Sequence, residues 1–307
     1  MISVMVRNMT LRSQYDDLDI SVIVVAPDEK PKAVIQFAHG MCGCKERFLP
    51  VMTYMAGNGI LCVAGDHRGH GGSIKSLEDL GYMYKGGYKA LVADMKLITA
   101  WIHNEYPDIP LYVLGHSMGS LAARVYVKQD DSDIAGLILC GSPSFSRMTY
   151  LGKAITGILC MLGLDRHRMV SSQKTASARY NRKFENEGEQ AWTCSDAESR
   201  KSMMENPLCN FVFTANGSYN LLSMMIETYR KDEWMVSNPE LPIYFISGSE
   251  DPVMADETKL HEAALNICGR GYLNVTSAIY PAMRHEVLNE TGKEMVWDDI
   301  LNFVTRN

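Results

Sequence analysis

The sequence has no excess of positive charge and no long uninterrupted hydrophobic run. The chain contains 30 Lys and Arg residues and 36 Asp and Glu residues, which gives a formal net charge of −6 at pH 7. A protein that neutralises nucleic-acid phosphates needs a basic surface, so we expect no nucleic-acid partner. No stretch reaches the roughly 18 apolar residues that a transmembrane helix requires, so no transmembrane segment is expected.

Cysteine is present, but not in the arrangement of a zinc or redox site. The 8 cysteines are scattered along the chain, and no two have the C-x-x-C spacing. No H-E-x-x-H motif or carboxylate cluster indicates a metal either. Residues 1–20 carry early charges and no sustained apolar stretch, so we expect no signal peptide. Together with the scattered cysteines, several of which lie in apolar runs, this favours a reducing, cytoplasmic location.

What the chain does contain is a series of short apolar runs. Continuous runs of this kind are typical of parallel strands that are covered on both faces. Two stretches of alternating residues nearer the N-terminus, at 2–8 and 19–26, predict an antiparallel hairpin or edge strands. The apolar runs lie at 33–40, 60–71, 111–119, 134–143, 242–252 and 274–285.

Helical periodicity separates the apolar runs and defines the domain organisation. Residues 86–104 and 295–304 place apolar side chains at steps of three and four. Strand–helix alternation predicts an α/β protein with a mostly parallel, doubly wound sheet. The alternation breaks between 144 and 236, where helical and charged segments replace strands. We therefore expect a core made of 1–143 and 237–307, with a helical cap inserted at 144–236.

A serine lies between two glycines where the run at 111–119 gives way to a helical pattern. This G-x-S-x-G segment has the form of a nucleophile elbow. Gly115 and Gly119 remove side chains that would clash as strand and helix approach each other. We predict Ser117 as the nucleophile and the backbone N–H of Met118 as one oxyanion donor. The alternative is a glycine-rich turn with an idle serine.

A serine hydroxyl is a weak nucleophile at neutral pH and needs a base and an orienting carboxylate. His285 follows the last predicted strand, and Glu250 and Asp251 follow the strand before it. Asp251 precedes Pro252, which favours an extended conformation there. We therefore predict His285 as the base and Asp251 as its carboxylate partner, with Glu250 as the alternative partner. The order Ser117, Asp251, His285 is that of the α/β-hydrolases.

Two further loops contain candidate residues. The turn HGMCG at 39–43 follows the first apolar run, and we predict the backbone N–H of Met41 as the second oxyanion donor. The loop GDHRGHGGS at 65–73 looks catalytic because it contains two histidines. We interpret it as structural and expect Asp66 and Arg68 to form an ion pair that locks the loop.

Taken together, these motifs resemble the monoacylglycerol lipase and lysophospholipase branch of the α/β-hydrolases, which also contains proteins described as serine aminopeptidases. The resemblance covers about 33–143 and 240–307, and NPLCNFVFT at 206–214 is similar to the cap of bacterial lysophospholipase-like members. It implies an α/β-hydrolase fold, with Ser117, Asp251 and His285 as catalytic triad and Met41 and Met118 as oxyanion donors. The sequence departs from its relatives at Cys42 and Cys44, where they more often carry bulkier or polar residues.

The leading hypothesis is a serine hydrolase that cleaves monoacylglycerol, lysophospholipid or similar small esters through an acyl-enzyme, with no cofactor. Apolar cap helices are expected to roof Ser117, to accept an acyl chain and to make transient contact with a membrane surface. A serine aminopeptidase or amidase is the nearest alternative, because cap carboxylates could hold a free amine. These are Glu185, Glu187, Glu189, Asp196 and Glu198. The third hypothesis is a non-catalytic ligand-binding homologue, although such proteins usually lack a triad member and this sequence offers all three.

Overall fold

The strands of the protein lie in a single sheet. The computed structural model describes residues 4–306, and within them eight strands follow the order β1-β2-β4-β3-β5-β6-β7-β8. Strands β3 to β8 are parallel, whereas β1 and β2 form an antiparallel hairpin that pairs with β4. The predicted mostly parallel sheet is therefore confirmed, and so is the N-terminal hairpin, except that residues 2 and 3 of its first predicted strand lie outside the described residues. The bounds are β1 (Val4–Arg12), β2 (Asp19–Pro27), β3 (Ala33–Ala38), β4 (Ile60–Gly65), β5 (Leu111–His116), β6 (Gly136–Cys140), β7 (Ile243–Gly248) and β8 (Val275–Tyr280).

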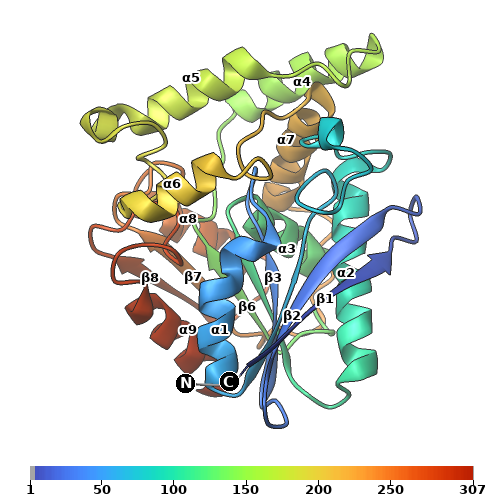
Figure 1. Cartoon of the computed structure of the whole chain (residues 1–307), viewed down its shortest axis with the longest axis vertical. Helices are drawn as coiled ribbons and strands as arrows, with labels where there is room; N and C mark the ends of the chain where they lie inside the picture. The colour runs from blue at the N-terminus through green and yellow to red at the C-terminus, as the bar shows by residue number, and fades with distance from the viewer. Residues whose placement is uncertain (1–3, 307) are drawn as a thin grey trace.

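Helices cover both faces of the sheet, as Figure 1 shows. Successive strand residues point to opposite faces, so Val113 and Leu114 of β5 belong to two different hydrophobic cores. One core includes side chains of α2 (Gly87–Glu105), α3 (Met118–Gln129) and α8 (Glu257–Cys268). The other includes side chains of α1 (Leu49–Gly57) and α9 (Lys293–Arg306). The helices predicted at 86–104 and 295–304 correspond to α2 and α9.

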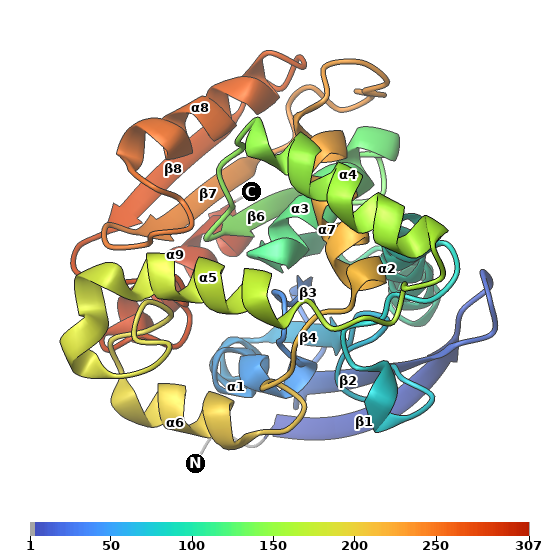
Figure 2. The same ribbon diagram turned by 90° about the horizontal axis from the view of Figure 1, so that it is seen from above.

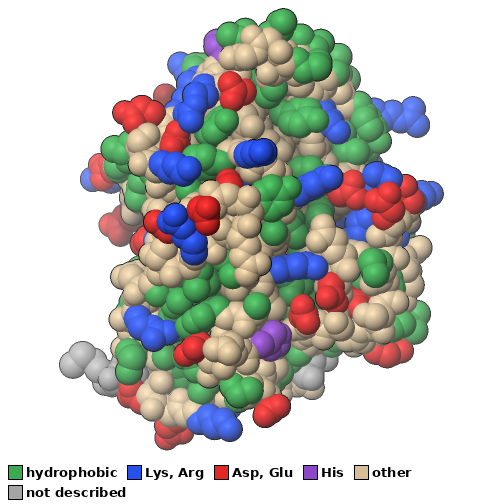
Figure 3. Space-filling model, turned by 90° about the vertical axis from the view of Figure 1, so that its right-hand side faces the viewer, with side chains coloured by type: hydrophobic (Ala, Val, Ile, Leu, Met, Phe, Trp, Pro, Cys, Tyr) green, Lys and Arg blue, Asp and Glu red, His purple; other side chains and the backbone are tan. Residues whose placement is uncertain are grey.

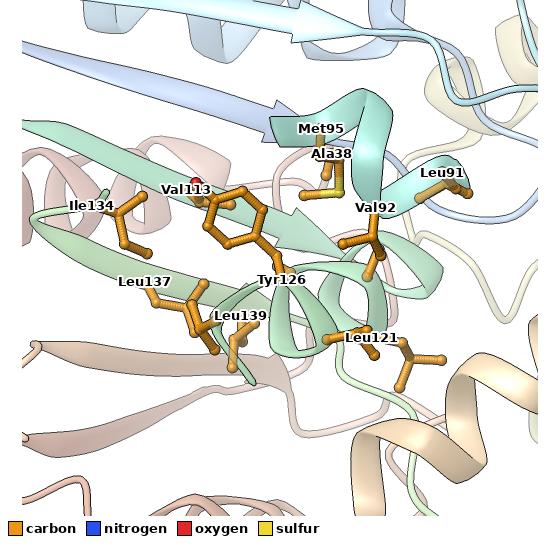
Figure 4. Close-up of a cluster of buried hydrophobic side chains, with 14 of the residues drawn as sticks. Ala38, Leu91, Val92, Met95, Val113, Leu121, Tyr126, Ile134, Leu137 and Leu139 are labelled. Carbon is orange, nitrogen blue, oxygen red and sulfur yellow. The ribbon is translucent and has the colours of Figure 1, made fainter. Parts of the chain in front are cut away.

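The core between α2, α3 and the sheet is close-packed and fixes the position of α3. Figure 4 shows Met95 of α2, Tyr126 of α3 and Val113 of β5 in one cluster of buried side chains. Leu137 and Leu139 of β6 belong to the same cluster, and all five side chains are almost fully buried. Because α3 begins one residue after Ser117, this packing also fixes the first turn of the helix.

Helices rather than strands connect β6 to β7. Four α-helices and one 3-10 helix form this segment, and Figures 1 and 2 show α4, α5 and α6 beyond the end of the sheet where β5 and β6 finish. Helix α7 packs against α2, α3 and α4. The bounds are α4 (Met148–Met161), α5 (Val170–Asn181), η3 (Arg182–Glu187), α6 (Ala197–Glu205) and α7 (Ala215–Tyr229).

Helix α4 turns its small side chains inward and its large apolar side chains outward. Thr149 and Thr156 are buried, and Gly152 and Gly157 lie against side chains of α7. Six of its large apolar residues are half or more exposed, namely Met148, Tyr150, Leu151, Ile155, Ile158 and Met161, whereas Leu159 is partly buried. No helix within residues 4–306 is both long and apolar enough to span a membrane.

Candidate active site

Ser117 occupies a strained turn between β5 and α3. Its backbone has φ 52° and ψ −118°, a conformation that costs a non-glycine residue about 1–3 kcal/mol. The Ser117 N–H donates to the carbonyl oxygen of Cys140 in β6 at 2.9 Å, which holds the turn. A Cβ on Gly119 would lie 2.0 Å from the Ala38 carbonyl oxygen, and one on Gly115 would lie 2.4 Å from that of Gly119. The turn therefore requires glycine at both positions.

Three side chains from three strand ends form one hydrogen-bonded chain. Nε2 of His285 lies 2.8 Å from Oγ of Ser117, and Nδ1 lies 3.0 Å from each carboxylate oxygen of Asp251. Asp251 also accepts hydrogen bonds from the Ser247 hydroxyl at 3.0 Å and the Val253 N–H at 2.8 Å. Because a carboxylate only accepts, Nδ1 carries the proton and Nε2 is free to take one from Ser117.

Glu250, the reserve candidate, does not face His285. Its carboxylate lies 3.9 Å from Nε of Arg284, and its side chain is 43% exposed. Asp251, by contrast, is 2% exposed. The structure brings Asp251 to the histidine and leaves Glu250 at the surface.

Burial and charge shift the pKa values of His285 and Asp251 in opposite directions. Burial lowers the pKa of His285, but the charge and hydrogen bond of Asp251 outweigh it, and the pKa lies above the ordinary 6.5. Burial also raises the pKa of Asp251, yet the His285 partnership leaves it below its usual value. Asp251 is therefore ionised at neutral pH, and His285 becomes neutral only above its raised pKa.

The turn at 39–43 lies directly against Ser117. A Cβ on Gly40 would lie 3.0 Å from the Ser117 Cβ. The Gly43 N–H donates to the Gly40 carbonyl oxygen at 3.1 Å and closes the turn around Met41 and its neighbour. Within residues 4–306, neither the Met41 N–H nor the Met118 N–H at the start of α3 has a hydrogen-bond acceptor. Both predicted donors are thus unpaired and flank the serine.

The loop at 65–73 is structural, but the expected ion pair between Asp66 and Arg68 is wrong. Asp66 pairs with Nζ of Lys45 at 2.7 Å, whereas Arg68 donates to Asp94 at 2.8 Å. The Asp66 carboxylate also accepts the backbone N–H groups of Lys45 and Gly72, which turn it away from Arg68. Both side chains are almost fully buried, so each requires a partner of opposite charge. No local pattern in the sequence identifies Lys45 or Asp94 as those partners.

The residues that support the His285 loop were not predicted from the sequence. The Glu286 N–H donates to the Thr193 carbonyl oxygen at 2.7 Å. Glu290, fully buried, accepts the N–H groups of Ser195 at 2.8 Å and of Arg284 at 2.9 Å. The Trp192 ring lies 5.4 Å from the His285 ring. Apart from the hydrogen bond between Arg284 and Glu290, these contacts join segments far apart in sequence, and no periodic pattern indicates them.

The sheet order and the elbow between β5 and α3 define an α/β-hydrolase. A family profile described as serine aminopeptidase, S33, matches residues 29–292, and the chain belongs to this family. Its relatives include the monoacylglycerol lipase of Mycolicibacterium smegmatis, 22% identical over 92% of this chain and 91% of the relative. The monoglyceride lipase of Mus musculus is 30% identical over 37% of this chain and 36% of its own length.

Solved structures share the fold. A thermostable carboxyl esterase from Bacillus coagulans superposes with a TM-score of 0.88 at 24% identity, over 98% of both chains. A monoglyceride lipase from Saccharomyces cerevisiae, in complex with a substrate analogue, has a TM-score of 0.74 at 15% identity, over 98% of this chain and 96% of that one. The chain is therefore an α/β-hydrolase of the serine aminopeptidase S33 family, and it is similar to monoacylglycerol lipases.

Proposed function

We propose that this chain is a serine hydrolase that cleaves carboxylic esters of monoacylated lipids, such as monoacylglycerol or lysophospholipid, or similar small esters. The hydrogen-bonded chain from Ser117 through His285 to Asp251 carries the proposal. The family and its lipase relatives support the same reaction class. All eight cysteines are free thiols, in keeping with the reducing, cytoplasmic location that we propose.

The proposed reaction proceeds through an acyl-enzyme. Oγ of Ser117 attacks the ester carbonyl carbon while Nε2 of His285 takes the hydroxyl proton. The N–H groups of Met41 and Met118 donate to the resulting oxyanion, each worth about 3 kcal/mol of barrier. His285 then protonates the leaving alcohol. A water, deprotonated by the same histidine, attacks the acyl-enzyme and releases Ser117, so that no cofactor is required.

Residues 144–236 are proposed to act as a cap over the site and to favour an ester over an aminoacyl amide. Of the five carboxylates that could hold a substrate amine, Glu187 binds Arg284 at 2.8 Å through both oxygens, and Asp196 caps the first turn of α6. The other three, at 185, 189 and 198, are exposed to solvent. An exposed carboxylate attracts an ammonium group only weakly.

The acyl-chain profile tests this function. We expect kcat/KM for p-nitrophenyl esters, measured below micelle-forming concentrations, to rise by about two orders of magnitude over four added methylenes. The same assay includes monoacylglycerols, lysophospholipids and aminoacyl amides. A flat profile from C2 to C10, or faster turnover of an amide than of any ester, would reject the lipid-ester proposal in favour of the peptidase.

The exposed apolar side of α4 is proposed to contact the lipid aggregate that supplies the substrate. In Figure 3, hydrophobic side chains gather at the upper end of the molecule, where Figure 1 places the end of α4. Ile158 is 52% exposed and Met161 is 80% exposed. Such a surface gains free energy when it enters the boundary region of a lipid layer.

Charged substitutions on this side should separate lipid contact from catalysis. We expect Ile158→Asp combined with Met161→Asp to lower the rate on emulsified monoacylglycerol about tenfold, since an aspartate opposes insertion into lipid. The rate on dissolved p-nitrophenyl butyrate should stay unchanged. Leu265→Asp, at a leucine of α8 that is 68% exposed, is the matched control and should leave both rates unchanged. An equal loss on both substrates would refute the lipid-contact role.

A further inference from the structure

The turn that carries the Met41 N–H contains a cysteine in a backbone conformation that favours glycine. Cys42 has φ 55° and is the second central residue of the turn closed between Gly40 and Gly43. At this position a positive φ is normally supplied by glycine or asparagine. A strained residue persists only where its surroundings hold it, and such residues cluster at functional sites. The contacts of Cys42 therefore bear on function.

The thiol of Cys42 contacts the segment between α6 and α7. Its Sγ–H donates to the carbonyl oxygen of Phe211 at 3.3 Å. Gln173 of α5 fixes that segment, because its Nε2 donates to the same carbonyl at 3.0 Å and its Oε1 accepts the Phe213 N–H at 3.1 Å. Burial raises the pKa of the Cys42 thiol to about 12, so the thiol remains a donor at neutral pH.

Cys44 makes a second contact with the same segment. Its Sγ lies 3.4 Å from Sγ of Cys209, and both thiols are buried. The Asn206 side-chain amide lies 3.9 Å from Sγ of Cys44. The turn is thus attached at Cys42 and at Cys44 to residues 206–211, while the Met41 N–H next to it stays unpaired in the described chain.

We infer that Cys42 is a positioning residue for the oxyanion site, and that its thiol, anchored on the Phe211 carbonyl, holds the turn so that the Met41 N–H meets the developing oxyanion. The inference rests on the proposed function. Cys42 acts through the backbone of the turn and takes no part in bond making. Cys42 thereby couples residues 206–213 to transition-state stabilisation.

The test compares three single variants on p-nitrophenyl acetate. Cys42→Ala should lower kcat about tenfold and leave KM within about twofold, because the oxyanion donor acts mainly in the transition state. Cys42→Ser retains a hydroxyl donor for the Phe211 carbonyl and should restore most of kcat. Cys268→Ala, at an exposed thiol in the last turn of α8, is the control and should match the wild type.

Two further variants distinguish the positioning role of Cys42 from a purely structural role. Cys42→Gly relieves the positive φ, so Tm should stay the same or rise by about 2 °C, while kcat falls as in Cys42→Ala. Gln173→Ala removes the hydrogen bond to the Phe211 carbonyl and the 3.9 Å contact of Gln173 Nε2 with the Cys42 thiol, and should reproduce part of the kcat loss. A wild-type kcat in Cys42→Ala, no rescue by serine, or a fall of Tm in step with kcat would overturn the inference.

Labelling of the wild-type enzyme by a fluorophosphonate distinguishes this inference from the function on which it rests. If the wild type is labelled and hydrolyses the ester while Cys42→Ala behaves identically, only the role of Cys42 is wrong. If the wild type is neither labelled nor active on any ester, the proposed function fails and the role of Cys42 fails with it.

Discussion

The Ser117→Ala variant is expected to lose fluorophosphonate labelling and to lower kcat by about five orders of magnitude or more. The hydroxyl is the group that forms the acyl-enzyme, and alanine leaves neither a nucleophile nor a partner for Nε2 of His285 at 2.8 Å. The fold should survive, because the turn depends on Gly115 and Gly119 rather than on the side chain between them. Mass mapping of the adduct, with the kcat of both proteins, checks the expectation.

Ser120 offers a matched control for this substitution. It lies one turn along α3, is fully buried, and its hydroxyl donates to the Ser117 carbonyl oxygen at 2.6 Å. Ser120→Ala removes a serine hydroxyl from the same helix, yet should keep labelling and leave kcat within about tenfold of wild type. An adduct on another serine, or equal labelling of wild type and Ser117→Ala, would contradict the assignment of Ser117 as the nucleophile.

The sequence predicted the inner part of this molecule well, for physical reasons that particular elements make clear. Strands β3 to β7 are covered on both faces and read as continuous apolar runs. The carboxyl ends of parallel strands meet at one edge of a sheet, so loops after β5, β7 and β8 bring together residues 134 positions apart, such as Ser117 and Asp251. Chain order and strand ends were therefore sufficient to propose the triad.

The outer parts could not be predicted in the same way. Helix α5 has no buried residue, so its sequence carries no apolar period. In α4 the period is present, but a period states only that apolar residues share one side of a helix, not which way that side faces. The apolar side of α4 faces outward, and threonine and glycine pack against α7. Strand β8, at the sheet edge, exposes Thr276 and Ser277, unlike the inner strands.

The other contacts that could not be predicted join residues distant in sequence. Lys45 meets Asp66 across 21 positions, and the Cys42 thiol meets the Phe211 carbonyl across 169. Neither pair leaves a local signature, because each depends on how the loops of a finished fold come to lie side by side. The cysteines at 42 and 44 are visible in the sequence, but their contacts required the structure.

The Asp251→Asn variant is expected to lower kcat by about four orders of magnitude, whereas Glu250→Gln should leave it within about threefold. An amide N–H opposite Nδ1 of His285 favours the tautomer with the proton on Nε2, which cannot accept the Ser117 proton. The buried carboxylate at 3.0 Å is also the charge that stabilises the imidazolium once it forms. Glu250 provides neither effect, because its carboxylate is partly exposed and lies beside Arg284.

The pH profile provides a second, independent measurement of the same assignment. His285 must be neutral to act as base, and its pKa lies above 6.5 because Asp251 outweighs burial. The kcat/KM of the wild type should therefore rise with pH through a midpoint above 6.5. In Asp251→Asn the charge is gone and burial remains, so the midpoint of the residual activity should move to lower pH. In Glu250→Gln the midpoint should stay with the wild type. An unchanged midpoint in Asp251→Asn, or a larger kcat loss in Glu250→Gln than in Asp251→Asn, would show that Asp251 is not the residue that orients His285.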